Sequence, residues 1–486
     1  MKKAGMIILL IAAGISITFA GGLVVNTNQS AEFVRTMNRN ATTELDAAYF
    51  NPAGLTKLSD GFHLYISNQT LLQNRTVYVM TDTTYEGGDT LLPQSPILYN
   101  KDSYEGTTFA PVFPSIHLAY KTGNMALSGS FMPVGGGGSA DFPEGLPAFE
   151  NQLAGTKGNP VNLVAMLLGL SPLEAFALSP YGSVEEYDLD AAFVGSSIYL
   201  GFQGNVAGAI NDMISISAGV RYIYAKNEYE GHLRDITLIT SSSPADTIDN
   251  TITSEQIPYL GNKEVKAMKT GSTYTGIFGV NITPFEGLNI GLKYETYSKL
   301  QLTNDTEADS VNLFPDGAVS NDDIPALLAA GISYQATPKL RLEGSFNYYW
   351  NKGLNWYSGA EVVTLSGGEE DTLIISKDAE DFLDDGYEGG LAVEYSVNEK
   401  LQVSAGFLYN IGGAKDTYNS DMDYSMPSST TVGLGARYFL SPRMALSVGF
   451  LDVFYEEAKN DKLDTPDFER YGKTTVDVAV GFQYSF

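Results

Sequence analysis

The segment 474–486 at the carboxyl end of the chain alternates between apolar and polar side chains. A β-strand sends successive side chains to opposite faces, so this segment predicts a strand with one polar face and one apolar face rich in aromatic residues. The apolar positions are Val476, Val478, Val480, Phe482, Tyr484 and Phe486. Such a strand, ending on an aromatic residue, is typical of bacterial outer-membrane β-barrels. We expect barrel-assembly machinery to recognise it through its end at Phe486.

The amino-terminal residues have the pattern of a secretory signal peptide. Lys2 and Lys3 form a short basic region, residues 4–19 are apolar, and Thr-Phe-Ala at 18–20 is a small-x-small cleavage site. The alternative is a transmembrane anchor, but the apolar stretch is shorter than the roughly 20 residues that a helical span needs. We therefore expect residues 1–20 to be removed during export to the outer membrane.

The composition excludes several classes of protein. The sequence has no cysteine, so neither a disulfide framework nor thiol chemistry is available. Its formal net charge of −28 argues against nucleic acid as a partner, because phosphate binding needs clustered Lys and Arg. A mean hydropathy of −0.08 suits strands in which apolar and polar positions alternate. Acidic residues concentrate in the long connections, where we expect solvated loops rather than cation sites.

Alternation with a period of two recurs along the chain and predicts about fourteen strands. They begin near residues 61, 114, 124, 191, 213, 271, 286, 324, 338, 386, 399, 428, 442 and 474. Short connections rich in turn residues alternate with long polar ones, as in outer-membrane barrels. We therefore predict an all-β fold, a transmembrane antiparallel β-barrel over residues 61–486 with long extracellular loops. A two-sheet sandwich is the alternative, but it does not require this alternation of loop lengths.

The same alternation assigns a face to each charged side chain in the strands. A charge that faces lipid at mid-depth costs roughly 2–4 kcal/mol, so we expect these side chains to face the lumen. They are Arg221, Lys293, Glu295, Arg341, Glu343, Glu394, Arg437 and Asp477. One interpretation is a lattice of salt bridges that stiffens the barrel. The other is that cations of this set bind the anionic headgroup of a ligand. The candidates for that role are Arg221, Lys293, Arg341 and Arg437.

Residues 21–60 do not alternate like a strand. Residues 30–37 instead predict a short amphipathic helix that begins with a Ser N-cap. A segment of this kind, ahead of the first strand and on the side of the short turns, is well placed to fold back into the lumen as a plug. We call residues 21–60 the hatch. Within it, Pro52 fixes φ and Gly54 permits a tight turn, and Asn51 is expected to cap backbone groups.

The hatch contains the run AYFNPAGL at residues 48–55, whose core is Asn51, Pro52, Ala53 and Gly54. This run resembles the Asn-Pro-Ala motif in the amino-terminal hatch of the FadL/TodX family, outer-membrane transporters of long-chain fatty acids and other hydrophobic compounds. The resemblance covers the whole chain, from the signal peptide to the terminal aromatic residue. It implies a fourteen-stranded barrel closed by the hatch, ligand capture between extracellular loops, and sideways release through a gap at a kink in the third strand.

The third predicted strand runs into a sequence that disfavours strand pairing. Pro133 cannot donate a ladder hydrogen bond. The residues after Val134 have no side chains to pack and tolerate a bent backbone; they are Gly135, Gly136, Gly137 and Gly138. In hydrocarbon an unpaired backbone is costly unless it lines a cavity or is buried in protein. Two interpretations stay open: a functional break that matches the family's lateral opening, or simply the end of the strand.

The long connection that follows the third strand is unusually apolar. Large exposed apolar patches usually mark binding or membrane contact, so this loop is a candidate site for ligand capture. The residues we single out for capture are Phe149, Leu163, Leu167 and Phe176. The alternative is that the apolar segments form helices that pack on each other and cap the barrel mouth.

No catalytic constellation emerges, so we do not expect an enzyme. His63, His117 and His232 are scattered, whereas a lipase needs a Ser–His pair held by an acid or amide. No metal-ligand spacing is present, and we expect no cofactor. We expect an outer-membrane transporter of hydrophobic small molecules, long-chain fatty acids above all, surrounded by outer-membrane lipid. The alternatives are a general porin, which would need an open lumen, and an adhesin-like barrel; an outer-membrane lipase would need the missing triad.

Overall fold

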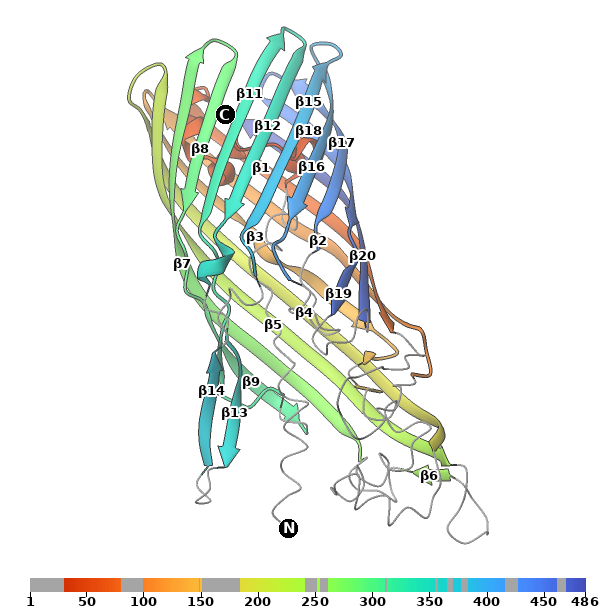
Figure 1. The fold of residues 1–486 in the computed structure, drawn as a ribbon. Helices are drawn as coiled ribbons and strands as arrows, with labels where there is room; N and C mark the ends of the chain where they lie inside the picture. Colours follow the sequence, from red (N-terminus) through yellow and green to blue (C-terminus); the bar gives the residue numbers. More distant parts are fainter. Residues whose placement is uncertain are drawn as a thin grey trace.

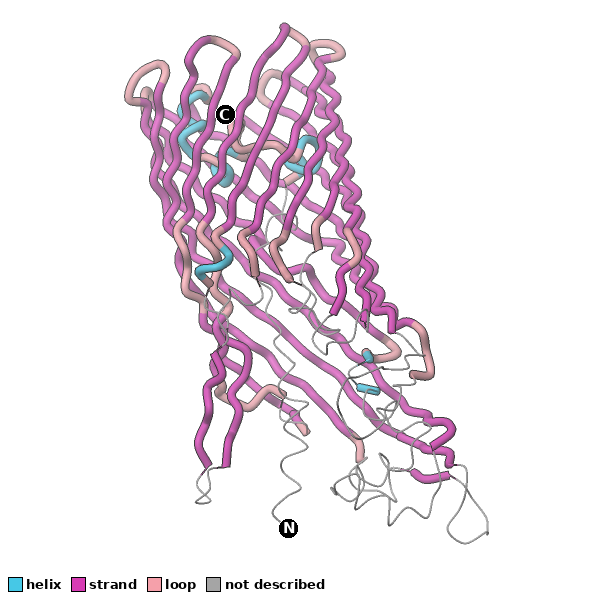
Figure 2. The backbone as a smooth tube through the Cα atoms, viewed as in Figure 1, coloured by secondary structure: helices cyan, strands magenta, loops and turns pink. Residues whose placement is uncertain are grey.

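The computed structural model describes residues 30–79, 99–147, 149–150, 184–240, 251–253, 261–310, 313–354, 357–364, 370–376, 383–415, 427–460 and 469–486. Within these ranges the chain forms a closed antiparallel β-barrel (Figure 1). Short helices lie inside the barrel, and the tight turns gather at one end of it (Figure 2). Among the described residues, no helix is long and apolar enough to cross a membrane.

Fourteen strands of the described chain form the barrel wall, each antiparallel to its neighbours. They are β1 (Gly61–Val79), β2 (Ser103–Thr122), β3 (Met125–Phe142), β4 (Val184–Ala209), β5 (Ile214–Thr240), β7 (Lys263–Phe285), β8 (Leu288–Glu295), β11 (Leu327–Thr337), β12 (Leu340–Tyr349), β15 (Gly386–Ser396), β16 (Leu401–Ile411), β17 (Ser429–Ser441), β18 (Met444–Tyr455) and β20 (Glu469–Ser485). The remaining strands are β6 (Thr251–Thr253), β9 (Gln301–Asp309), β10 (Val319–Asn321), β13 (Tyr357–Thr364), β14 (Glu370–Ser376) and β19 (Ala458–Asn460). The helices are α2 (Ala31–Thr36) and α3 (Ala47–Phe50), with the 3-10 helices η1 (Pro52–Lys57) and η3 (Asn351–Gly353).

The first and last strands close the barrel. β1 pairs with β2 on one side and with β20 on the other. The register with β20 runs from His63↔Ser485 to Val79↔Glu469 without a shift. The predicted fourteen-stranded barrel is therefore confirmed, and its closure removes the unpaired edges that an open sheet would expose.

Three strands begin seven or more residues earlier than the alternation predicts. They are β2 at Ser103 rather than near 114, β4 at Val184 rather than near 191, and β7 at Lys263 rather than near 271. The added residues lie at the end of the barrel opposite the tight turns. There Tyr104, Tyr187 and Val265 pack into one buried apolar cluster. Beyond the bilayer neither face of a strand must be apolar, so polarity no longer alternates and the sequence pattern fades.

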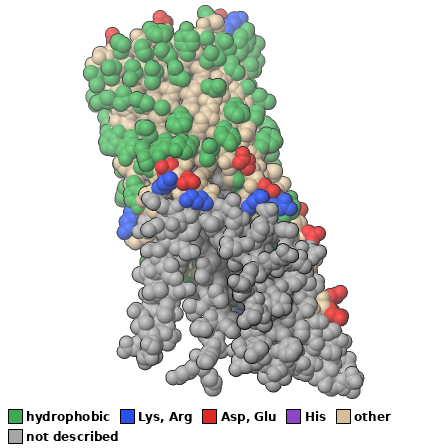
Figure 3. Space-filling model, in the orientation of Figure 1, with side chains coloured by type: hydrophobic (Ala, Val, Ile, Leu, Met, Phe, Trp, Pro, Cys, Tyr) green, Lys and Arg blue, Asp and Glu red, His purple; other side chains and the backbone are tan. Residues whose placement is uncertain are grey.

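The outer face of the wall carries an apolar band, with Lys, Arg, Asp and Glu gathered at its lower edge (Figure 3). On β8, Leu292 and Tyr294 are 41% and 40% exposed, whereas Lys293 and Glu295 are 4% and 7% exposed. Of the eight charged residues that we assigned to the lumen, seven are buried and Arg341 is 19% exposed. The predicted faces of these strands are therefore confirmed.

The wall is much taller on one side than on the other. β4 and β5 have 26 and 27 residues, whereas roughly 9–11 residues cross a bilayer. Their excess length projects from the end opposite the tight turns (Figure 1), which is the extracellular end in a barrel of this kind. A buried cluster that includes Phe193, Tyr229 and Phe314 gives this extension its own core.

The described part of the hatch fills the lumen. Ser30 caps α2 by accepting a hydrogen bond from the Phe33 amide, as predicted, and the helix ends at Met37 in the left-handed conformation. Two further backbone amides at the start of α2 donate to wall side chains, Ser67 Oγ at 2.9 Å and Tyr65 Oη at 3.2 Å. The free N–H groups of the helix are thus satisfied by the barrel itself.

Glycines on the inner face let the hatch lie directly against the wall. A Cβ added at Gly406 on β16 would overlap the Thr36 carbonyl, and one added at Gly435 on β17 would overlap the Arg35 side chain. Both positions face inward, so any larger residue would push α2 away from the wall. The inward glycines thus set how closely the hatch can fit.

We predict that Gly406→Val displaces the hatch while the barrel still folds. Overpacking of this kind costs roughly 1–3 kcal/mol or more, and it acts on the hatch backbone rather than on the outer face. The measurement is ion conductance across planar bilayers, with heat-modifiable electrophoretic mobility to show folding. The matched control is Gly204→Val, because a Cβ there meets nothing within 4 Å. A folded Gly406→Val barrel as closed as the wild type would contradict this account.

Candidate ligand-binding site

Two arginines of the hatch lie fully buried among carboxylates. Arg39 Nε lies 2.7 Å from Asp46, and its Nη2 lies 2.7 Å from Glu44. Arg35 Nε lies 2.7 Å from Glu32, and its Nη1 bonds Glu394 on the barrel wall. A buried charge is tolerated when it is paired and hydrogen-bonded, so these residues form the polar core of the plug.

The wall completes this hatch network. Arg341 on β12 binds Glu44 at 3.2 Å and Glu394 at 3.1 Å, and Arg437 on β17 binds Glu44 at 2.8 Å. Arg39 also reaches Glu343 on β12 at 3.4 Å. Two of the four headgroup candidates therefore hold the hatch to the wall, and neither of them lines the pocket described next.

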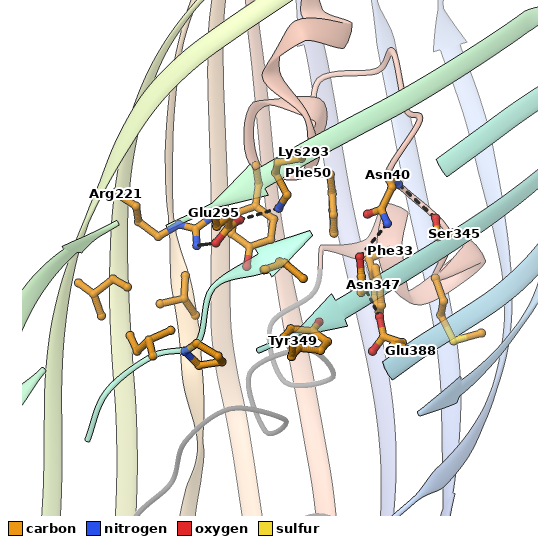
Figure 4. A pocket seen from close by; sticks show the side chains of 17 residues that line it. Phe33, Asn40, Phe50, Arg221, Lys293, Glu295, Ser345, Asn347, Tyr349 and Glu388 are labelled. Carbon is orange, nitrogen blue, oxygen red and sulfur yellow. Dashed lines mark hydrogen bonds and ion pairs between the residues drawn. The ribbon is translucent and has the colours of Figure 1, made fainter. Parts of the chain in front are cut away.

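A pocket lies between the hatch and the wall, on the extracellular side of α2 and α3 (Figure 4). The hatch contributes apolar side chains, chiefly Phe33, Met37 and Phe50. The wall contributes the other two headgroup candidates, Arg221 on β5 and Lys293 on β8. We call Arg221 and Lys293 the cation pair.

The cation pair shares one carboxylate. Arg221 makes a two-pronged contact with Glu295 at 2.7 and 3.0 Å, and Lys293 Nζ lies 2.6 Å from the same carboxylate. Gln203 holds the Arg221 guanidinium from a second side, at 2.7 and 2.9 Å. The ring of Tyr49, on the hatch, lies 4.5 Å from Arg221 and 5.3 Å from Lys293, which favours both cations by cation–π attraction.

The other side of the pocket carries uncharged and acidic groups. Asn40 of the hatch donates to Asn347 on β12 at 2.8 Å, and Asn347 donates to Glu388 on β15 at 2.7 Å. The backbone N–H of Asn40 also donates to Ser345 Oγ at 3.3 Å. The pocket is thus polar at two separated places and apolar between them (Figure 4).

The stretch Pro133–Gly138 lies where β3 separates from β2. The two strands pair from Ile116↔Phe131 to Thr122↔Met125 and again only at Thr107↔Asp141, so this fully described stretch has no β2–β3 pairs in between. On its other side β3 stays bonded to β4, with register shifts on both sides of Gly135. We call residues 108–115 and 132–140 the β2–β3 gap.

The kink in β3 depends on glycine. Gly136 and Gly138 have φ angles of 82° and 81°, a conformation that other residues rarely adopt. Val134 directly precedes the kink and faces inward, where its side chain is 3% exposed and lines the pocket. The pocket therefore touches the β2–β3 gap directly.

The gap has a second side that the sequence analysis missed. In β2 the pairing with β1 shifts register between Gln69 and Leu71, opposite a segment that contains Pro111. The Pro111 carbonyl accepts hydrogen bonds from Asn68 and Thr70 side chains instead of a ladder partner. A proline within a strand signals an edge or a bulge, so Pro111 was the signal available for this feature.

Residues of the hatch motif touch the wall rather than cap a helix. Asn51 is fully buried and its amide donates to the Val280 carbonyl on β7 at 3.0 Å; it makes no side-chain cap for η1. The predicted capping role is therefore replaced by a contact between hatch and wall. Gly279 and Gly291 leave room for the Asn51 side chain at the wall, because a Cβ at either position would collide with it.

Only one of the four capture candidates lies in the described chain. Phe149 is half-buried, and its ring lies 5.9 Å from that of Phe193 at the extracellular end of the barrel. Leu163, Leu167 and Phe176 lie outside the described residues.

Two histidines of the described chain contact a serine hydroxyl. His63 Nδ1 lies 2.9 Å from Ser485 Oγ, and its Nε2 lies 2.9 Å from the Ser59 carbonyl rather than from an acid. The second is His117. His117 Nδ1 lies 3.0 Å from Ser130 Oγ, across the last inward-facing β2–β3 pair before the gap. The His117 ring is fully buried and stacks on Tyr65 with centroids 5.7 Å apart. Its ring hydrogen-bonds no carboxylate or amide in the described chain. This pair joins two strands and lacks the third member that a catalytic triad needs.

We predict that Glu44→Gln loosens the hatch. Glu44 is the carboxylate that Arg39, Arg341 and Arg437 have in common, and removing one partner of a buried ion pair costs roughly 3–5 kcal/mol. The expected result is faster proteolysis of the hatch in an otherwise folded barrel. The control Glu144→Gln removes an exposed ion pair with Lys101, worth roughly 0–1 kcal/mol. Equal protease resistance of both variants would contradict the role of Glu44.

Comparison with known proteins agrees with this fold. Residues 175–486 match the model of the outer membrane protein transport protein family (OMPP1/FadL/TodX). Among curated proteins, none matches the chain. Similar solved structures include a FadL homologue from Pseudomonas aeruginosa, with 14% identity, coverage of 96% of this chain and 100% of that chain, and a TM-score of 0.60.

Two further structures share the fold. The toluene transporter TodX from P. putida is 12% identical, with 92% of this chain and 95% of that chain covered and a TM-score of 0.54. The toluene transporter TbuX from Ralstonia pickettii is 13% identical, with 96% and 99% covered and a TM-score of 0.53. Because the family model spans more than half of the sequence, this chain belongs to the OMPP1/FadL/TodX family of outer-membrane proteins, non-enzymatic transporters of hydrophobic compounds.

Proposed function

We propose that this transporter takes up long-chain fatty acids. The acid is captured at the extracellular end and binds in the lumen with its carboxylate at the cation pair. It then leaves sideways into the bilayer through the β2–β3 gap. The proposal includes export with removal of residues 1–20 and insertion by barrel-assembly machinery that recognises the strand ending at Phe486.

The observation that carries the proposal is the charge balance at the cation pair. Within the described part of the chain, Glu295 is the one carboxylate in ion-pair contact with Arg221 or Lys293. Two buried positive charges therefore share one negative charge next to an apolar cavity. A ligand carboxylate would supply the missing charge through charge-assisted hydrogen bonds, whereas a plain hydrocarbon would not.

The apolar part of the pocket suits the tail of the same ligand. Phe33 and Phe50 stack with ring centroids 5.7 Å apart, and Tyr349 lies on the opposite wall. Each CH₂ group removed from water is worth about 0.8 kcal/mol. A long tail thus gains free energy in the pocket and keeps that gain if it leaves directly into lipid.

Contact between the pocket and the gap supports the sideways route. Val134 lines the pocket and lies between Pro133 and Gly135, where β3 has left β2. An interrupted ladder in the hydrocarbon zone is costly unless it faces a cavity or protein, and here it borders the lumen. For capture, Phe149 supports the apolar loop as the first contact, because it packs beside the buried extracellular cluster.

A second candidate ligand is a monoaromatic hydrocarbon. The aromatic side chains Phe33, Tyr49, Phe50 and Tyr349 that line the pocket favour it. A neutral ring would stack on these side chains but would leave the cation pair unchanged, so the two candidates predict different effects of removing a cation.

We predict that Lys293→Met weakens octadecanoate binding by roughly 10-fold or more, because a hydrogen bond to a charged group is worth roughly 1.5–3 kcal/mol. The variant keeps the two-pronged Arg221–Glu295 pair, so the barrel should remain folded. Binding is measured by equilibrium dialysis of the purified protein in nanodiscs. The matched control, Lys266→Met, removes a lysine that is 47% exposed on β7.

Two outcomes would contradict the proposal. One is wild-type affinity for octadecanoate in the Lys293→Met protein. The other is a wild-type protein that binds toluene but not octadecanoate, which would favour the aromatic hydrocarbon instead.

A further inference from the structure

Glu388 is the least satisfied titratable side chain in the pocket. It is 3% exposed, and its Oε1 accepts a hydrogen bond from Asn347 at 2.7 Å. Its second oxygen, Oε2, has no hydrogen-bond partner among the described residues. The side chain lines the cavity across from the cation pair (Figure 4). A buried polar atom without a partner is costly, and here it borders a space that a ligand can fill.

Strand register places Glu388 in one row with Lys293, one member of the cation pair. Lys293 on β8 is the register partner of Ala329 on β11, Ala329 of Asn347 on β12, and Asn347 of Glu388 on β15. Three strand spacings, roughly 14 Å along the wall, separate the backbones of Lys293 and Glu388.

The row continues past Glu388 with two more polar side chains. Asn410 on β16 is the register partner of Glu388, and Ser429 on β17 is the partner of Asn410. Both are 1% exposed, and Asn410 Nδ2 and Ser429 Oγ have no partner in the described chain. One level of the inner wall thus has a cation at one end and several unsatisfied polar atoms at the other.

We propose that the pocket selects carboxylates with a second polar group along the chain, namely hydroxy fatty acids. The carboxylate binds the cation pair, and the hydroxyl donates a hydrogen bond to Glu388 Oε2. The apolar surface between these points, with Phe33, Phe50 and Tyr349, takes the intervening methylene groups. This inference rests on the proposed function, and it narrows the substrate class.

The two kinds of acid differ in whether they satisfy Glu388. A plain fatty acid leaves Glu388 Oε2 buried beside methylene groups without a partner, whereas a hydroxy acid supplies one. A site built to hydrogen-bond a hydroxyl rejects an analogue that lacks it, because the polar group of the site is then left unpaired. The competing explanation is that an ordered water satisfies Glu388 whichever acid is bound, and it predicts no preference.

The test compares octadecanoate with 12-hydroxyoctadecanoate on the wild-type protein and on two variants, Glu388→Leu and Glu388→Gln. Binding is measured by equilibrium dialysis in nanodiscs, and the readout is the ratio of the two Kd values in each protein. We expect the wild type to favour the hydroxy acid roughly 3- to 10-fold, the effect of one net hydrogen bond. Glu388→Gln keeps an acceptor oxygen at the same place and should keep the preference, whereas Glu388→Leu should bring the ratio to about one.

The outcomes separate the role of Glu388 from the proposed uptake of fatty acids. A wild-type protein that binds both acids equally overturns the role of Glu388 and leaves the proposed function standing. A preference that survives in Glu388→Leu also overturns it. If neither acid binds the wild type, the proposed function fails and this inference fails with it. The wild-type comparison decides even if Glu388→Leu does not fold.

Discussion

Arg39 and Glu44 bind each other inside the hatch, and each also binds the barrel wall. The rest of the structure depends on this contact. Taking charges out of water is costly, and the cost is met only when each charge finds partners with good geometry. The hatch and the wall each bring an incomplete set of charges, and the two sets are satisfied only when the hatch is seated.

The seated hatch also forms one side of the candidate pocket. Its α2 and α3 place Phe33, Met37 and Phe50 against a wall that would otherwise surround open water. The lattice at Arg341 and Arg437 closes one side of the lumen, and the cation pair on β5 and β8 is left facing a cavity. Arg341 and Arg437 thus belong to the salt-bridge lattice, whereas Arg221 and Lys293 remain the candidates for headgroup binding.

Most of the fold was predictable from the sequence because the bilayer imposes a simple rule. Lipid outside and polar groups inside force side chains to alternate. The apolar Leu292 is therefore assigned to the lipid face, and the charged Lys293 to the lumen. The extracellular parts of β2, β4 and β7 escape this rule, since they are packed by protein on the inside and are not held in lipid. The sequence therefore misplaced the start of three strands.

The site was harder to predict because it depends on contacts between distant segments. Inward orientation of Arg341 and Arg437 follows from alternation, but their binding to Glu44 does not. The partner of Asn51 was missed for the same reason, since it is set by glycines on β7 and β8. Pro133 and the four glycines after Val134 marked the β3 side of the β2–β3 gap. On the β2 side, the sequence offers only Pro111, and the register shift beside it is seen only in the pairing of β2 with β1.

Sideways exit of the ligand between β2 and β3 is tested most directly by a reversible disulfide across the β2–β3 gap. A Cβ at Gly138 would lie 3.4 Å from the Ala110 Cβ, close to the roughly 3.5–4.5 Å of a disulfide. The natural chain has no cysteine, so Ala110→Cys with Gly138→Cys can form only one intramolecular bond. The Gly138→Cys single variant is the control for backbone strain, because Gly138 has a φ of 81°. The measurement is uptake of labelled octadecanoate by cells that carry this double variant, with and without a reductant. The account predicts retained binding and lost uptake when the bond is formed, with uptake restored on reduction. Normal uptake through the oxidised barrel would contradict it.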